Sequence, residues 1–106
     1  MRFIIHGVGA IGGTIAVTLA AAGEEVIGIA RGEQLKAIQA NGLTLRTPAG
    51  TEIRRFECVD TPNAITLRPD DVVMVCTKTQ HMGAVIEQLS AAGLRDQAVF
   101  CFQNGV

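Results

Sequence analysis

The sequence has 106 residues, 48% of them apolar, and its 9 Lys and Arg residues nearly balance its 10 Asp and Glu residues. A chain of this length can bury one hydrophobic core, so one domain is expected, and the balanced charge argues against nucleic acid or an anionic membrane as a partner. The first apolar run, residues 3–5, is too short for a signal peptide, and no stretch approaches the ~20 apolar residues of a membrane span, so a cytoplasmic protein is expected.

The first thirty residues predict a strand, a helix and a second strand. Residues 3–6 form a short β-type run, and the glycine-rich segment 7–12 follows it directly. Ala, Ile, Val and Leu residues continue the expected helix to Ala22, and Gly23 is suited to end it. Residues 25–30 then have the composition of a second strand, which completes a βαβ unit.

The rest of the chain continues this alternation, with a hairpin inserted. Further helices are predicted over 33–40 and 79–92. Further strands are predicted over 43–47, 53–59, 71–76 and 98–102, of which the first two form the hairpin and the last two read as buried. Because parallel strands linked by helices need crossover connections, the expected fold class is α/β: a Rossmann-like, mostly parallel open sheet with helices on both faces.

The glycine-rich segment predicts a dinucleotide-binding loop. A diphosphate reaches the backbone amides at a helix N-terminus only if no Cβ stands in its way. Gly7 would make the tight turn, Gly9 would let the diphosphate approach, and Gly12 would let the helix pack on the first strand. The predicted loop comprises Gly7, Val8, Gly9, Ala10, Ile11 and Gly12. The alternative is a turn with a purely structural role.

The residue after the second strand favours NADPH as the cofactor. NAD-specific sites place an Asp or Glu there to accept from the adenosine ribose, whereas this sequence has Ala30-Arg31-Gly32. The guanidinium of Arg31 can bind the 2′-phosphate that distinguishes NADPH from NADH, and Glu33 nearby would reduce that preference. The alternative is an ordinary solvated charge, which is also the expectation for Lys36.

Two further motifs support a family resemblance. Cys76-Thr77-Lys78-Thr79-Gln80 follows one predicted strand, and Gln103-Asn104-Gly105-Val106 follows the next. Together with the glycine loop and Arg31, they make the chain resemble the ketopantoate reductase (2-dehydropantoate 2-reductase) family over essentially its whole length. That family reduces 2-dehydropantoate to pantoate with NADPH, a step toward pantothenate and coenzyme A, and joins a Rossmann domain to a helical substrate domain. The resemblance implies that residues 1–106 are the NADP-binding domain, without the helical domain.

The resemblance also assigns roles to two residues beyond the loop. Lys78 would contact the cofactor near its ribose and phosphate groups, and Asn104 would meet both the nicotinamide and the 2-oxo acid substrate. Their structural alternatives are a solvated lysine at a helix start and an asparagine chosen for a turn. The family's general acid is a lysine of the helical domain, so no catalytic residue is expected in this chain. The chain alone is expected to bind NADPH weakly and to reduce nothing.

The remaining reactive side chains are expected to be structural. His6 could donate to the cofactor, although an imidazole satisfied by local backbone is the favoured reading, and His81 is expected at the surface. Gln80 is a secondary cofactor candidate. Cys58, Cys76 and Cys101 are expected to be mostly buried thiols, and no metal site is predicted. Homodimerisation through apolar groups near the last strand is a further expectation.

The sequence is also compatible with three other functions. The chain could belong to another NADP-dependent oxidoreductase that acts on a different 2-oxo acid or on an imine. It could be a regulatory module that senses nicotinamide nucleotides, although such modules usually keep the acidic residue that Arg31 replaces. It could also be a Rossmann-like module without a nucleotide.

Overall fold

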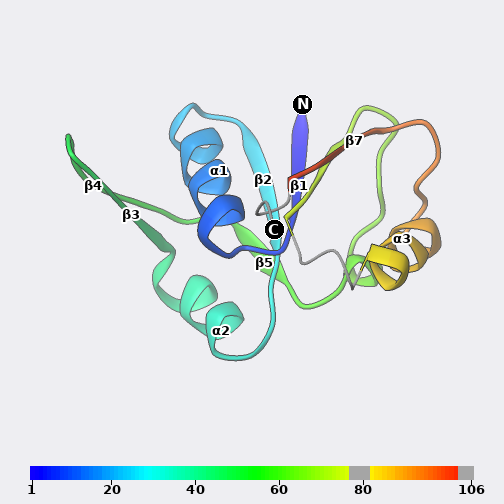
Figure 1. Ribbon diagram of the computed structural model, residues 1–106, viewed down its shortest axis with the longest axis horizontal. Coiled ribbons are helices and arrows are strands. Elements are labelled where there is room, and N and C mark those ends of the chain that lie inside the picture. The colour runs from blue at the N-terminus through cyan, green and yellow to red at the C-terminus, as the bar shows by residue number, and fades with distance from the viewer. Residues whose placement is uncertain (77–81, 103–106) are drawn as a thin grey trace.

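The computed structural model describes residues 1–76 and 82–102, which form a layered α/β unit (Figure 1). In chain order its elements are β1 (Arg2–His6), α1 (Ala10–Ala21), β2 (Glu25–Ile29), α2 (Gly32–Asn41), β3 (Leu43–Thr47), β4 (Gly50–Arg54), β5 (Glu57–Val59), the 3₁₀ turn η1 (Pro62–Ala64), β6 (Val72–Val75), α3 (Met82–Ala91) and β7 (Ala98–Cys101). The predicted alternation of strands and helices is confirmed.

The main sheet is parallel and has the topology expected of a Rossmann-like unit. Within the described residues it has five strands in the order β5-β2-β1-β6-β7, with every neighbouring pair parallel. In the register, His6 at the end of β1 pairs with Ile29 of β2 and with Val75 of β6. The carboxyl ends of these three strands therefore meet at one edge of the sheet, which is where parallel sheets bind ligands.

Helices cover both faces of this sheet, as predicted. In Figure 1, α1 and α2 lie on one side of the strands and α3 lies on the other. Successive side chains of a strand point to opposite faces, so Ile5 packs in the cluster with Ala16 of α1, whereas Ile4 packs in the cluster with Leu89 of α3. Ile4 and Ile5 are both fully buried, because β1 is the central strand and has a helix layer on each side.

The predicted strand over residues 53–59 is wrong, because the chain divides it between two sheets. β4 pairs antiparallel with β3 in a hairpin that projects from the body of the molecule, whereas β5 joins the main sheet beside β2 (Figure 1). The physical reason is the space at Gly28 of β2. A Cβ there would lie 2.9 Å from Phe56 Cε2 and 3.4 Å from Cys58 Sγ, so the missing side chain lets both of these residues pack on the sheet.

The last strand is also less buried than its apolar sequence predicts. β7 pairs with β6 at the edge of the five-stranded sheet, Phe100 is 50% exposed and Cys101 is exposed. An apolar run therefore identified a strand here but misplaced it in the interior. The helix predicted over 79–92 is found as α3, and residues 79–81 lie outside the described part of the chain.

Candidate functional site

The glycine loop connects β1 to α1 at the carboxyl edge of the sheet. Gly7 has φ +95°, a backbone conformation that residues other than glycine rarely adopt, and its N–H donates to Ile29 O at 3.0 Å. Gly9 is the N-cap of α1 and has no side-chain cap, so the first amides of this helix lack the partner that a Ser, Thr or Asp would supply. Such a helix terminus is suited to an anion.

Gly12 and Gly9 serve different purposes. A Cβ at Gly12 would lie 2.0 Å from Gly7 O and 3.3 Å from Cys76 Cβ, so the close approach of α1 to β1 and β6 requires glycine. A Cβ at Gly9 would meet no atom of the described residues within 4 Å. The fold needs Gly12, whereas at Gly9 the missing side chain leaves open space in front of the helix.

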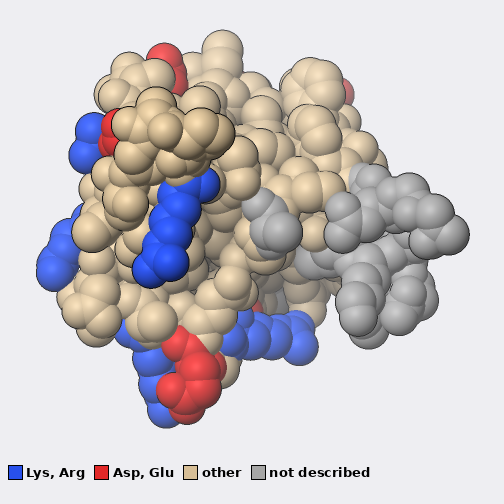
Figure 2. Space-filling model, turned by 60° about the vertical axis from the view of Figure 1, so that its left-hand side comes forward, with Lys and Arg blue, Asp and Glu red and all other residues tan. Residues whose placement is uncertain are grey.

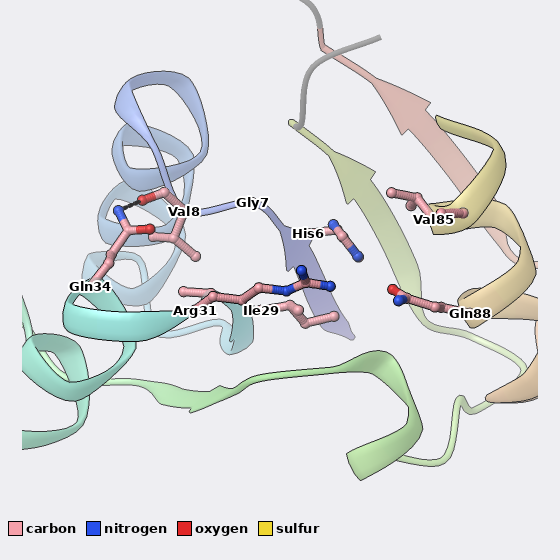
Figure 3. A pocket seen from close by; sticks show the side chains of 10 residues that line it. His6, Gly7, Val8, Ile29, Arg31, Gln34, Val85 and Gln88 are labelled. Carbon is pink, nitrogen blue, oxygen red and sulfur yellow. Dashed lines mark hydrogen bonds between the residues drawn. The ribbon is translucent and has the colours of Figure 1, made fainter. Parts of the chain in front are cut away.

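A pocket of about 340 Å³ opens beside this loop (Figure 3). It lies between the ends of β1 and β2, the start of α2 and the inner side of α3. Its lining residues are His6, Gly7, Val8, Ile29, Ala30, Arg31, Gln34, Ala84, Val85 and Gln88. The pocket therefore joins the predicted loop to the predicted selectivity residue, Arg31.

Arg31 is exposed and lies directly before α2 as its N-cap, in an extended conformation. Figure 3 shows its guanidinium extending along the pocket toward His6. Glu33 lies in the first turn of the same helix and is exposed, as is Lys36, the residue expected at the surface. A single cation thus reaches into this pocket from α2, among the residues that line it.

Gln34 is a pocket residue that the sequence analysis missed. Its side-chain Nε2 donates to Val8 O, which ties the start of α2 to the glycine loop (Figure 3). A signal was available, because Gln34 follows Arg31 by three residues and residues i and i+3 share one face of a helix. The contact fixes the orientation of the Val8–Gly9 peptide.

His6 differs from its favoured interpretation. It is 8% exposed, and neither ring nitrogen has a hydrogen-bond partner among the described residues, so the prediction of an imidazole satisfied by local backbone is wrong. Burial lowers the pKa of His6, the nearby carboxamide of Gln88 opposes this in part, and the charge of Arg31 lowers the pKa further. His6 is accordingly neutral at pH 7.

The other predicted site residues divide into two groups. Val8 is buried, Ile11 is half-buried, and Ala10 begins α1. Lys78, Gln80, His81 and Asn104 lie outside the described residues, so the roles assigned to them stay predictions.

The thiols follow the prediction in part. Cys58 is buried in β5 and Cys76 is half-buried beside Gly12, and burial raises the pKa of both. Cys101 is exposed on β7, which corrects the expectation of a buried side chain. Within residues 1–76 and 82–102, no three His, Cys, Asp or Glu side chains are grouped so that they could hold a metal ion.

Charged side chains are scattered over the face shown in Figure 2. Lys and Arg side chains there are separated by uncharged surface, and several lie beside acidic ones. None of the helices in the described part of the chain is long and apolar enough to cross a membrane.

Comparison with known proteins extends these observations. The family model described as "Ketopantoate reductase PanE/ApbA" matches residues 3–106. The chain belongs to this family. A relative named 2-dehydropantoate 2-reductase, from Mesorhizobium japonicum, is 35% identical over 107 residues, which are 100% of this chain and 32% of the relative. This family member thus spans about a third of the length of that relative.

Solved structures show the same fold. The crystal structure of a PanE/ApbA family ketopantoate reductase from Ralstonia eutropha JMP134 has a TM-score of 0.86 and 32% sequence identity, over 99% of this chain and 35% of that one. A D-mandelate dehydrogenase in a ternary complex with NADH and anilino(oxo)acetate has a TM-score of 0.84 at 22% identity, over 100% of this chain and 34% of that one. At that identity the second likeness concerns the fold alone.

Proposed function

We propose that this chain is the NADPH-binding domain of a 2-oxo acid reductase, and that the substrate is 2-dehydropantoate, which is reduced to pantoate. The choice of NADPH as cofactor is supported by one observation: the side chain of Arg31 extends into the pocket beside the glycine loop (Figure 3). A guanidinium binds a phosphate through charge-assisted hydrogen bonds but cannot accept from a ribose hydroxyl. The substrate half is supported by the family and by the names of its members.

The glycine loop fits the diphosphate of such a cofactor. Open space in front of Gly9 admits an anion to the uncapped N-terminus of α1, and Gln34 holds the Val8 carbonyl to one side. Arg31 lies at the start of the neighbouring helix, α2, in the same pocket. The loop would therefore hold the diphosphate and Arg31 the adenosine 2′-phosphate.

When bound, the cofactor supplies the hydride for the reduction. The residues of this chain bind and orient it. By family resemblance, Lys78 would contact its ribose and phosphate groups, and Asn104 would meet the nicotinamide and the substrate. Among the described residues that line the pocket, His6 is not suited to protonate an alkoxide, because burial lowers the pKa of its imidazole. The proton would come from the family's helical domain.

The test of the cofactor half is a titration of the chain with NADPH and with NADH, followed by reduced-nicotinamide fluorescence. One charge-assisted interaction is worth ~1.5–3 kcal/mol, so NADPH is expected to bind roughly tenfold to a hundredfold more tightly. Arg31→Ala should remove that difference and leave NADH affinity unchanged. Lys36→Ala, on the exposed side of the same helix, is the matched control. Equal affinities in the unsubstituted chain would refute the assignment of Arg31.

The test of the domain assignment is a turnover assay of the same preparation. Residues 1–106 with NADPH and 2-dehydropantoate are expected to show no oxidation of the cofactor above background, because by family resemblance the general acid belongs to the helical domain and not to these residues. Measurable turnover would mean that the proton donor lies in this chain, and the domain assignment would be abandoned.

A further inference from the structure

The strongest unexplained feature of the pocket is the buried imidazole of His6. The alternation of β1 places His6 on the same face of the sheet as Ile4, which is the face that α3 covers. Buried polar groups in proteins nearly always have a partner, yet neither nitrogen of His6 has one among the described residues. An unsatisfied imidazole that lines a pocket indicates that its partner belongs to a ligand.

Gln88 shares this part of the pocket. It projects from α3 toward the imidazole, and Val85, one turn earlier, lies beside it (Figure 3). Neither ring nitrogen of His6 is hydrogen-bonded, although the Gln88 carboxamide lies near enough to raise the pKa of the imidazole, and a carboxamide brings two donor hydrogens and an acceptor of its own. The walls around the two polar groups include the apolar side chains of Ile29 and Val85, both buried. A polar end between apolar walls suits a flat heterocycle with its attached sugar.

The pocket contains one charged group and two neutral polar groups, which suit different parts of a ligand. Arg31 is the cation, and its charge helps to keep the imidazole of His6 neutral. A neutral imidazole has one donor and one acceptor, and a carboxamide has both. His6 and Gln88 are therefore matched to uncharged groups that both donate and accept, such as ribose hydroxyls or the edge of a nucleobase, whereas Arg31 is matched to a phosphate.

We propose that His6 and Gln88 bind the adenosine of the nicotinamide cofactor through neutral hydrogen bonds and set its affinity, while Arg31 sets the choice between NADPH and NADH. The inference rests on the proposed function. If Arg31 holds the 2′-phosphate, the ribose and adenine attached to that phosphate must lie next to Arg31, and the remaining space of the same pocket is bounded by His6, Gln88 and Val85.

The experiment compares His6→Leu and Gln88→Leu with the unsubstituted chain. Kd is measured for NADPH, for NADH and for adenosine 2′,5′-bisphosphate, which lacks the nicotinamide. Each substitution is expected to weaken all three ligands by about the same factor, roughly tenfold, and to leave the NADPH-to-NADH ratio unchanged. His6→Asn, which keeps a donor and an acceptor, should recover most of the affinity. Ser90→Ala, on the exposed side of α3, is the control and should change nothing.

The melting temperature of the ligand-free chain separates ligand binding from a structural role. His6→Leu removes an unsatisfied buried polar group, so the free chain is expected to melt at the same temperature or higher, even though its affinity falls. A fall in both affinity and melting temperature for His6→Leu and Gln88→Leu alike would assign these residues to the fold and overturn the inference.

Two other outcomes would also overturn it. If His6→Leu weakens NADPH but not NADH, His6 contacts the phosphate; if it weakens neither, His6 does not contact the ligand. In both cases the unsubstituted chain still prefers NADPH and the proposed function stands. If the unsubstituted chain binds none of the three ligands, the proposed function itself fails and the inference fails with it.

Discussion

Each end of β1 carries a buried polar side chain, and the two side chains differ in whether the fold supplies them with hydrogen-bond partners. Arg2, at the start of the strand, is 7% exposed and makes hydrogen bonds through Nε to Asp71 Oδ1 at 3.0 Å and through Nη2 to Asp71 Oδ2 at 2.6 Å and Thr66 O at 2.9 Å. His6, at the other end, is 8% exposed and has no partner among the described residues.

Within one strand, one buried polar side chain is satisfied by the fold and the other lines a pocket without a partner among the described residues. At the amino edge of the sheet the fold supplies a buried cation with a counter-charge and three hydrogen bonds, which hold β1 against the segment before β6. At the carboxyl edge it buries an imidazole and leaves it open to a pocket. Substitutions at the first end should therefore change stability and leave affinity unchanged, and substitutions at the second end should do the reverse.

The largest expected effect is at the amino edge, from Asp71→Asn. Asp71 is 1% exposed, and the substitution would leave the guanidinium of Arg2 buried without its ion-pair partner. Breaking such a pair costs about 3–5 kcal/mol, which urea unfolding would measure. Glu52→Gln is the control, since its ion pair with Arg54 is exposed and should contribute less than ~0.5 kcal/mol. A loss below ~1 kcal/mol for Asp71→Asn would contradict the structural role of this end.

The next largest effect on stability is expected from Gly12→Ala, whereas Gly9→Ala should act mainly on nucleotide affinity. Gly12→Ala would place a Cβ 2.0 Å from Gly7 O, so either the loop or α1 must shift, and about 3 kcal/mol of stability is expected to be lost. Gly9→Ala meets no described atom within 4 Å and should cost less stability than Gly12→Ala, yet weaken NADPH at least tenfold by obstructing the diphosphate. Urea unfolding and nucleotide titration of both variants provide the check. Unchanged NADPH affinity in Gly9→Ala would remove the loop from the binding site.

The sequence predicted the elements that follow strong local patterns. Gly7 and Gly9 were correctly placed between β1 and α1, and Gly12 at the start of the helix, since a strand, a glycine turn and an apolar helix are each local signals. The split of residues 53–59 could not be predicted, because it depends on the space that Gly28, distant in the sequence, leaves for Phe56 and Cys58.

Contacts between residues that are far apart in the sequence could not be predicted either, because they depend on the arrangement of the whole sheet. The partner of Arg2 is 69 residues away, and the exposure of Phe100 depends on β7 lying at the edge of the sheet. The prediction for His6 was wrong because the surroundings of its imidazole depend on which residues of α3 face it, and neither ring nitrogen has a hydrogen-bond partner among the described residues. The part of the site that lies in the loop was predictable, and the part that α3 contributes was not.

The smallest expected effect is a difference in the pH dependence of stability between the two ends of β1. The pKa of His6 is lowered from its ordinary value of 6.5 by burial, so the unfolded chain binds the proton more tightly than the folded one. The free energy of unfolding should therefore be constant above about pH 7.5, decline as the pH falls below 6.5, and level off below the folded pKa.

Asp71 titrates in a separate range. Burial raises its pKa, but hydrogen bonds from Arg2 and from the Arg68 N–H, with the charge of Arg2, lower it by more, to below its ordinary 3.8. Its contribution is complete above pH ~5 and is lost as the pH falls through the folded pKa. Urea unfolding from pH 8 to pH 3 should show both declines, and His6→Asn should remove the first and keep the second. Persistence of the upper decline in His6→Asn would mean that a group other than His6 is responsible, and that the imidazole is not held neutral by burial.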